Sequence, residues 1–177
     1  MFENDQLKSL AKDVAVVLGI VLTFLILCQL VFGLWTPMYV VSSGSMEPNM
    51  NVGDIVFIKS IHRTDVITQQ DSIKMDKPYM KFNKGGDVIL YRPYGMEGVV
   101  PIIHRAMYYV EEGEEMWVDG PPAPHAGYIT KGDNVLTNPH YDQQTSISQG
   151  LPIKEEWIIG TSQFKIPYLG KIRLIFS

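Results

Sequence analysis

A run of 22 residues without a charged side chain, from Val14 to Trp35, constrains this chain more than any other feature. As an α-helix rising about 1.5 Å per residue it would be roughly 33 Å long, enough to cross the hydrocarbon core of a bilayer. It is longer than the roughly 7–15 apolar residues of a signal-peptide core, and no small-x-small cleavage pattern follows it at once. Soluble helices are seldom apolar on every side. The sequence therefore predicts a retained transmembrane helix over residues 14–35.

The charges on the two sides of this helix predict its orientation. Lys8 and Lys12 precede it, whereas the first basic residue after it is Lys59. Basic residues next to a spanning helix stay on the cytoplasmic side. We therefore expect residues 1–13 to be a cytoplasmic tail and residues 36–177 to form one domain outside, in a single-pass protein of the cell membrane.

The chain after the helix has the pattern of a β-domain. Short runs rich in Val, Ile, Tyr and Phe recur between Gly, Pro, Asn and Asp residues, and no long amphipathic helix separates them. This pattern indicates a mostly β fold, a small antiparallel β-barrel or sandwich, rather than a parallel α/β sheet. Strands are expected at residues 39–42, 54–59, 87–91, 102–111, 115–119, 126–130 and 157–164.

Two segments depart from the strand pattern. Residues 60–86 are polar and form a long excursion between two strands, with room for a short helix or hairpin. Residues 166–177 mix apolar side chains with Lys171 and Arg173, and they are too short to span a bilayer. This last segment fits a position at the membrane interface and a final strand of the domain equally well.

Composition and motifs exclude several function classes. The net charge of −4 disfavours a nucleic-acid partner, because phosphates are bound by basic patches. The single cysteine, Cys28, lies in the apolar run and permits no internal disulfide. The sequence contains neither a metal-ligand motif nor a glycine-rich phosphate loop. We therefore expect no metal, no other cofactor and no nucleic acid.

The first candidate for chemistry is the stretch Ser42–Pro48, which reads Ser-Ser-Gly-Ser-Met-Glu-Pro. Gly44 permits a close backbone approach or a positive φ, and Pro48 stiffens the turn. The small residues in front of Ser45 leave its hydroxyl uncovered, as a nucleophile requires when a base lies nearby. An ordinary Gly/Ser/Pro loop has the same composition, so these residues alone leave both interpretations open.

Four histidines are available as a base for such a serine. His62 lies in the polar excursion, and His125 and His140 follow proline-containing turns. Only His104 lies in a strand pattern, which can hold an imidazole rigidly enough for proton transfer. A lone histidine in a strand is more often structural, so the residues by themselves do not decide its role.

Five boxes of this sequence, in order, resemble those of the type I signal peptidases, which are membrane-anchored serine proteases that remove signal peptides. The boxes are Ser43–Pro48, Gly53–Val56, Gly86–Ile89, Ile103–Arg105 and Thr130–Asn134. The resemblance covers residues 14–142, with a poor match around residues 60–84. The pair His104-Arg105 resembles the archaeal and endoplasmic-reticulum branch, in which a histidine replaces the lysine base of the bacterial branch. The resemblance implies a small catalytic β-domain seated on the membrane.

The resemblance also implies roles for individual residues. Ser45 would be the nucleophile and His104 the general base, oriented by a carboxylate from Asp142 or Asp133. The backbone N–H of Ser45 and the hydroxyl of Ser43 would form the oxyanion hole.

The two aspartates differ in their surroundings along the chain. Asp133 belongs to a Gly-Asp turn that also occurs at Asp54 and Asp87, where no chemistry is expected. We therefore predict that Asp142 orients His104 and that Asp133 is structural support. Asp142 follows Asp133 by nine residues, which is longer than the family spacing, and Val135 stands in place of the family's second asparagine. These departures leave the assignment of the two aspartates open.

The substrates implied by the resemblance are signal-peptide-bearing preproteins, and the lipid bilayer and the protein-translocation machinery are further implied partners. A preprotein would add to a sheet edge as an extended segment, with small shallow pockets that admit only small side chains just before the cut. The pocket residues are not identified by the sequence, although Met46 and Ile102 lie next to the catalytic positions. Two alternatives remain. A self-cleaving protease of the Ser-Lys type would need a lysine where this chain has His104. An inactive membrane-tethered β-domain would bind preproteins or partner subunits without cleaving them.

Overall fold

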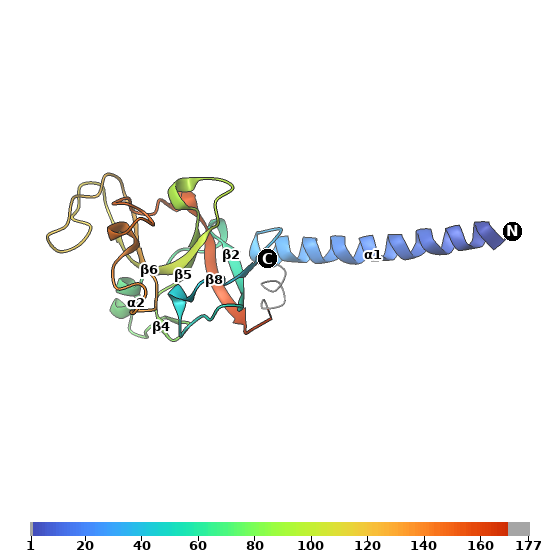
Figure 1. Cartoon of the computed structure of the whole chain (residues 1–177), viewed down its shortest axis with the longest axis horizontal. Helices are drawn as coiled ribbons and strands as arrows, with labels where there is room; N and C mark the ends of the chain where they lie inside the picture. Colours follow the sequence, from blue (N-terminus) through green and yellow to red (C-terminus); the bar gives the residue numbers. More distant parts are fainter. Residues whose placement is uncertain (1, 170–177) are drawn as a thin grey trace.

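The computed structural model of this chain describes residues 2–169. It begins with one long helix, α1 (Phe2–Phe32), which extends away from a small β-rich domain (Figure 1). By length and composition, α1 can cross a membrane over Gln6–Phe32. Only 6% of its most apolar window is buried, so α1 is not a helix of the domain core.

The end of α1 differs from the predicted span of residues 14–35. The helix stops at Phe32, because Gly33 has a φ of +71° and its N–H donates to the carbonyl of Gln29 at 3.0 Å. This is the left-handed glycine cap that commonly ends a helix.

The domain is built on one antiparallel sheet of six strands in the order β1-β2-β8-β5-β6-β7. The strands are β1 (Met38–Val40), β2 (Ile55–Ser60), β5 (Val88–Tyr91), β6 (Ile102–Val110), β7 (Gly127–Lys131) and β8 (Ile158–Ile166). The predicted class, a mostly β antiparallel domain behind one N-terminal helix, is confirmed. Among the described residues the sheet is open rather than a closed barrel, since β1 and β7 lie at its two edges and do not pair with each other.

The core of the domain follows the alternation of the strands. In β2, Val56 and Ile58 are fully buried, whereas all four residues of the central strand β5 are buried. Met46 and Met50, which follow β1, pack into the same cluster as Val56 and Ile58. The core therefore holds the segment that carries Ser45.

Six of the seven predicted strands are present, with ends within two residues of those observed. The strand predicted at residues 115–119 is wrong. This stretch forms only an isolated bridge between Glu115 and Pro122, and Asp119 adopts a positive φ of 58°. Gly120 and then Pro121 and Pro122 follow, and the two prolines lack the N–H groups that a ladder needs.

The polar excursion at residues 60–86 contains both elements for which the sequence left room. A short helix, α2 (Gln69–Lys74), is capped by the side chain of Thr68. A two-stranded hairpin follows, β3 (Met80–Lys81) with β4 (Lys84–Gly85). The remaining helical turns are η1 (Gly44–Met46), η2 (Ile61–Arg63), η3 (Pro93–Gly95), η4 (Asp142–Gln144) and η5 (Glu155–Trp157).

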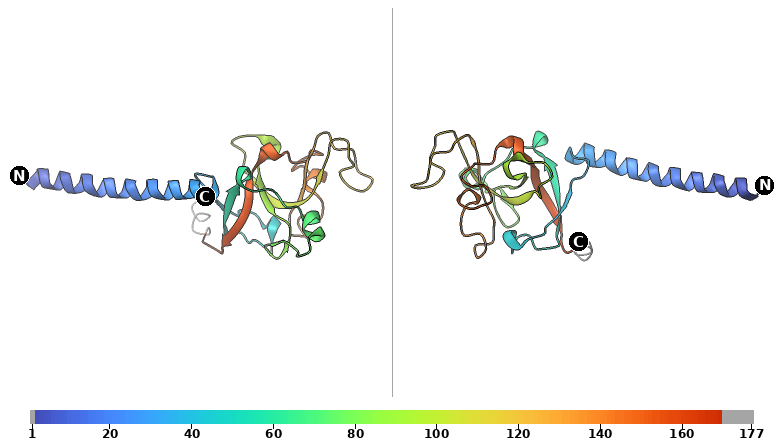
Figure 2. Two further views of the ribbon diagram at one scale, coloured as in Figure 1. Left: turned by 180° about the vertical axis from the view of Figure 1, so that it is seen from behind. Right: turned by 45° about the horizontal axis from the view of Figure 1, so that its top comes forward.

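The end of α1 is joined to the sheet by specific contacts. The ring of Phe32 lies 5.7 Å from that of Phe57 in β2 and 6.3 Å from that of Phe164 in β8. The guanidinium of Arg63 donates a hydrogen bond of 2.5 Å to the carbonyl of Leu30. Figure 2 shows α1 at one end of the molecule and the loop between β6 and β7 at the other. Most of the segment 166–177, predicted as interfacial or as a strand, lies outside the described residues.

Candidate active site

Ser45 lies in the turn η1, which follows β1 and is anchored by the fully buried side chain of Met46. The loop after β7 holds this turn from the other side. The side-chain amide of Asn134 donates to the carbonyl of Gly44, and its backbone N–H donates to that of Ser45, each at 2.9 Å. A Cβ at Gly132 would lie 2.6 Å from the Ser45 carbonyl oxygen, so only glycine fits this close approach.

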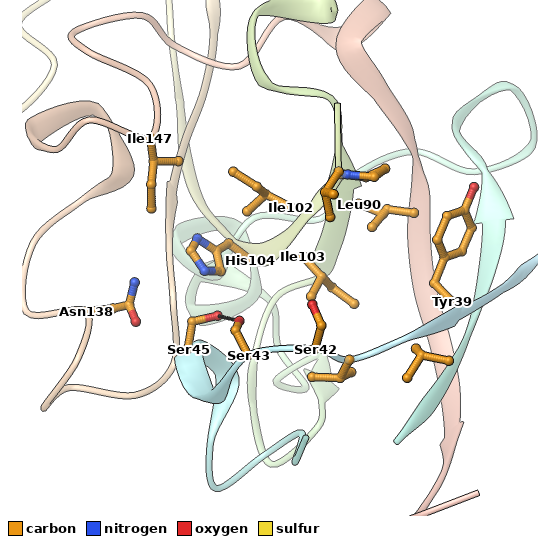
Figure 3. A pocket seen from close by; sticks show the side chains of 14 residues that line it. Tyr39, Ser42, Ser43, Ser45, Leu90, Ile102, Ile103, His104, Asn138 and Ile147 are labelled. Carbon is orange, nitrogen blue, oxygen red and sulfur yellow. Dashed lines mark hydrogen bonds between the residues drawn. The ribbon is translucent and has the colours of Figure 1, made fainter. Parts of the chain in front are cut away.

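A cavity of about 350 Å³ opens in front of Ser45. Its walls come from the segment after β1, from the start of β6 and from the loop beyond β7, and they are mainly apolar. Figure 3 shows the ring of His104 beside Ser45 and Ser43, with Asn138 and Ile147 on the far side. The hydroxyls of Ser43 and Ser45 are 3.2 Å apart.

His104 and Asp142 form a buried pair behind this cavity. His104 lies on β6, and its Nδ1 is 2.7 Å from Oδ2 of Asp142, which begins the turn η4. The two side chains are only 3% and 1% exposed. Because Nδ1 is engaged with the carboxylate, Nε2 is the ring nitrogen left for a serine hydroxyl. The hydrogen bonds of residues 2–169 include none between Ser45 and His104, and such bonds are often long before substrate arrives.

Asp133 lies in a second buried pair, with Arg105. Nε and Nη2 of Arg105 donate to its two carboxylate oxygens at 2.8 and 2.7 Å. The side-chain amide of Asn49 donates to the same carboxylate at 2.8 Å. Burial raises the pKa of the Asp133 carboxyl, but the hydrogen bonds and charge of Arg105, with smaller contributions from Asn49 and Lys84, outweigh it, so that this pKa lies below its usual value.

The structure thus brings together the predicted residues Ser43, Ser45, His104 and Asp142, while Asp133 lies against Arg105. Two further residues, to which the sequence analysis assigned no role in the site, also contact Asp142. Tyr91 and Thr130 donate to its Oδ2 at 2.9 and 2.6 Å. The sequence places Tyr91 in a predicted strand and Thr130 at the start of the box Thr130–Asn134, but no sequence pattern relates either hydroxyl to Asp142.

The other predicted candidates lie elsewhere. The ring of His125 packs against that of Trp157 at 5.7 Å, and neither His62 nor His140 lines the cavity. Within residues 2–169, no group of three His, Cys, Asp or Glu side chains is arranged to hold a metal ion.

An apolar helix joined to a β-domain, with a serine in the same cavity as one side of a buried histidine–aspartate pair, is the arrangement expected of a membrane-anchored serine hydrolase. No family model matches the chain. It is, however, similar to proteins named signal peptidase complex catalytic subunit SEC11. That of Lachancea thermotolerans is 31% identical over 147 residues, which cover 80% of this chain and 67% of the relative.

Two further relatives extend the similarity over more of the chain. SEC11 of Tuber melanosporum and of Talaromyces marneffei are 26% and 27% identical over 89% of this chain. The matches span 77% and 79% of these relatives. The chain belongs to the family of signal peptidase complex catalytic subunits, the endoplasmic-reticulum branch of the type I signal peptidases. It is a serine endopeptidase of that family, anchored in a membrane by α1.

Proposed function

We propose that this chain removes signal peptides from secreted preproteins with Ser45 as nucleophile, His104 as general base and Asp142 as the residue that orients it. Asp133 is structural support. The observation that carries this proposal is the 2.7 Å contact of His104 with Asp142 behind a cavity that Ser45 also lines.

The proposed reaction begins with the hydroxyl of Ser45. Its oxygen attacks the scissile carbonyl carbon while its proton passes to Nε2 of His104. Asp142 stays ionised and stabilises the imidazolium that forms. His104 then gives the proton to the leaving amine, which carries the mature protein away. A water molecule, deprotonated by the same imidazole, releases the signal peptide from Ser45.

The negative charge on the substrate oxygen needs donors that are in place before the substrate arrives. We assign this role to the backbone N–H of Ser45 and the hydroxyl of Ser43. The 3.2 Å distance between the two hydroxyl oxygens supports the second donor, because it keeps Ser43 beside the reacting oxygen.

The substrate, in this proposal, binds as an extended segment along the cavity. Within residues 2–169, β1 pairs with β2 on one side only, and its other side forms a sheet edge that leads directly to Ser43 and Ser45. Apolar walls that include Leu90, Ile102 and Ile103 favour small uncharged side chains before the cut.

The proposed orientation places residues 1–13 in the cytoplasm and residues 36–177 outside, with the signal peptide in the same membrane as α1. The relatives are named as subunits of a complex, which supports partner subunits for this chain. The protein-translocation machinery is a further proposed neighbour. In sealed right-side-out vesicles, added protease should degrade or release the domain. Protection of the domain, with trimming of only the first dozen or so residues, would reverse this orientation.

The decisive test is cleavage of a membrane-inserted preprotein by purified protein and by its Ser45→Ala form. We expect Ser45→Ala to fold, to lose turnover and to resist labelling by a serine-directed probe. Ser146→Ala, which removes an exposed hydroxyl outside the cavity, is the matched control and should cleave normally. Turnover by Ser45→Ala above the uncatalysed rate would exclude the serine mechanism. A wild-type protein that binds preproteins but neither cleaves nor reacts with the probe would be a binding domain.

A further inference from the structure

One oxygen of Asp142 receives all the hydrogen bonds that its carboxylate accepts from residues 2–169. Oδ2 contacts His104 Nδ1 at 2.7 Å, the hydroxyl of Thr130 at 2.6 Å and that of Tyr91 at 2.9 Å. Oδ1 is buried and accepts none from these residues. The carboxylate is therefore held in one rotational state, with a single oxygen facing the imidazole.

The two hydroxyls come from residues on hydrogen-bonded strands of the sheet. Tyr91 ends the central strand β5 and Thr130 lies on β7, and both side chains are fully buried. Their strands flank β6, which carries His104. Each hydroxyl has one proton, and each donates it to Asp142. Burial, together with the neighbouring Asp142 carboxylate, raises the pKa of Tyr91 well above its ordinary value, so this hydroxyl stays a donor across the working pH range.

We propose that Tyr91 and Thr130 are positioning residues, whose hydroxyls hold Oδ2 of Asp142 against Nδ1 of His104 and so keep Nε2 turned toward Ser45. This inference rests on the proposed function of that triad. The inference deepens the proposed function, because it names the two side chains that hold the Asp142 carboxylate, one from each strand beside β6.

The physical reason lies in the burial of Asp142. A carboxylate that is 1% exposed has no water to solvate its charge, and it can rotate about its Cβ–Cγ bond. Hydrogen bonds from neutral hydroxyls stabilise the charge and restrict the rotation without neutralising it. When the Ser45 proton reaches Nε2, the imidazolium then faces a fixed ionised oxygen. Without the hydroxyls the same pair forms with a wider range of geometries, and fewer of them present Nε2 to Ser45.

The test compares Thr130→Val, which keeps the shape and removes the hydroxyl, with Thr130→Ser, which keeps the hydroxyl. Full-length protein in detergent cleaves a fixed preprotein, and kcat, KM and melting temperature are measured for each variant. We expect Thr130→Val and Tyr91→Phe each to lower kcat by about tenfold with KM little changed. Thr130→Ser should restore kcat to within about threefold of wild type. Tyr108→Phe, which removes a hydroxyl bonded to Met116 outside the cavity, is the control and should keep kcat.

The outcomes separate this inference from the proposed function. Wild-type kcat in a folded Thr130→Val protein, or equal losses in Thr130→Val and Thr130→Ser, would overturn the positioning role. If Tyr91→Phe does not fold, the pair of Thr130 variants still decides. An inactive Ser45→Ala alongside fully active hydroxyl variants would refute the positioning role alone. Cleavage by Ser45→Ala would instead refute the proposed function.

Discussion

His104 and Arg105 are neighbours on β6, and each faces a buried aspartate, yet the two pairs differ in whether they can transfer a proton. Successive side chains of a strand point to opposite faces, so His104 turns to Asp142 behind the cavity and Arg105 turns to Asp133. Imidazole can gain and lose a proton near neutral pH, whereas guanidinium stays charged. One face of the strand can therefore move a proton, and the other carries a fixed ion pair.

The fixed pair joins three parts of the chain. Nη1 of Arg105 donates to the carbonyls of Gly85 and Gly86 at 3.1 and 2.7 Å, at the end of the polar excursion. Through Asp133 the network reaches Asn49, four residues after Ser45. The end of the excursion 60–86 is thus hydrogen-bonded to β6, which carries His104, and linked through Asp133 to the segment that follows Ser45. Variants of the His104–Asp142 pair should therefore mainly reduce activity, and variants of the Arg105–Asp133 pair should mainly reduce stability.

The largest effect is expected for Asp142→Asn. Replacement by the amide keeps the shape but no longer stabilises the imidazolium, and turnover should fall by about 10⁴. The melting temperature should change by only a few degrees. The readout is turnover on one preprotein together with thermal unfolding in the same detergent. Asp142→Asn protein that is still active, beside stable but inactive Asp133→Asn protein, would mean that the two aspartates have exchanged roles.

His104→Lys should lose turnover by roughly 10²–10⁴, although lysine is the base in the bacterial branch. A lysine serves as a base only if its environment lowers its pKa toward the working pH, and the carboxylate of Asp142 would hold the ammonium charged instead. His140→Lys, on an exposed loop, is the control. Rates near wild type for His104→Lys at neutral pH would show that Asp142 does not act on this position.

Asp133→Asn should mainly reduce stability and leave measurable cleavage in the folded fraction. The sequence alone would assign this aspartate a turn-capping role worth about 1 kcal/mol. The bidentate contact with Arg105 raises the expected loss to about 3–5 kcal/mol, because the substitution leaves a buried guanidinium without its counter-charge. Urea unfolding measures the loss, and a loss below about 1 kcal/mol would contradict the ion-pair role.

The smallest effect is a pH dependence of stability that comes from Asp133 in its pair with Arg105. The folded-state pKa of Asp133 lies below its usual value of 3.8, so its stabilising contribution is complete above that pH and is lost as the pH falls through the folded pKa. The melting temperatures of wild type and Asp133→Asn should therefore differ most near neutral pH and converge below pH 3.8. Asp54 and Asp87, whose pKa values are also shifted by their surroundings, are present in both proteins. A difference that stays constant down to the lowest pH at which both proteins fold would mean that Asp133 does not titrate with the ion pair.

The sequence by itself determined the parts of this protein that depend on local patterns. The uncharged run requires a helix that hides its backbone polar groups, and alternation with Gly and Pro punctuation places six of the strands. The wrong strand prediction at residues 115–119 has a local cause as well, because Pro121 and Pro122 lie just beyond this stretch. The turn around Ser45 could be recognised from its small residues and from the boxes that accompany it.

Only the tertiary structure decided which aspartate lies against which partner. Asp133 and Asp142 are nine residues apart in the chain, and either could have reached β6. The sheet separates them, because β6 directs His104 and Arg105 to opposite faces and the chain after β7 passes both. The hydroxyls of Tyr91 and Thr130 meet at Asp142 for the same reason. Contacts between residues on three different strands depend on strand order and register, which no local pattern encodes.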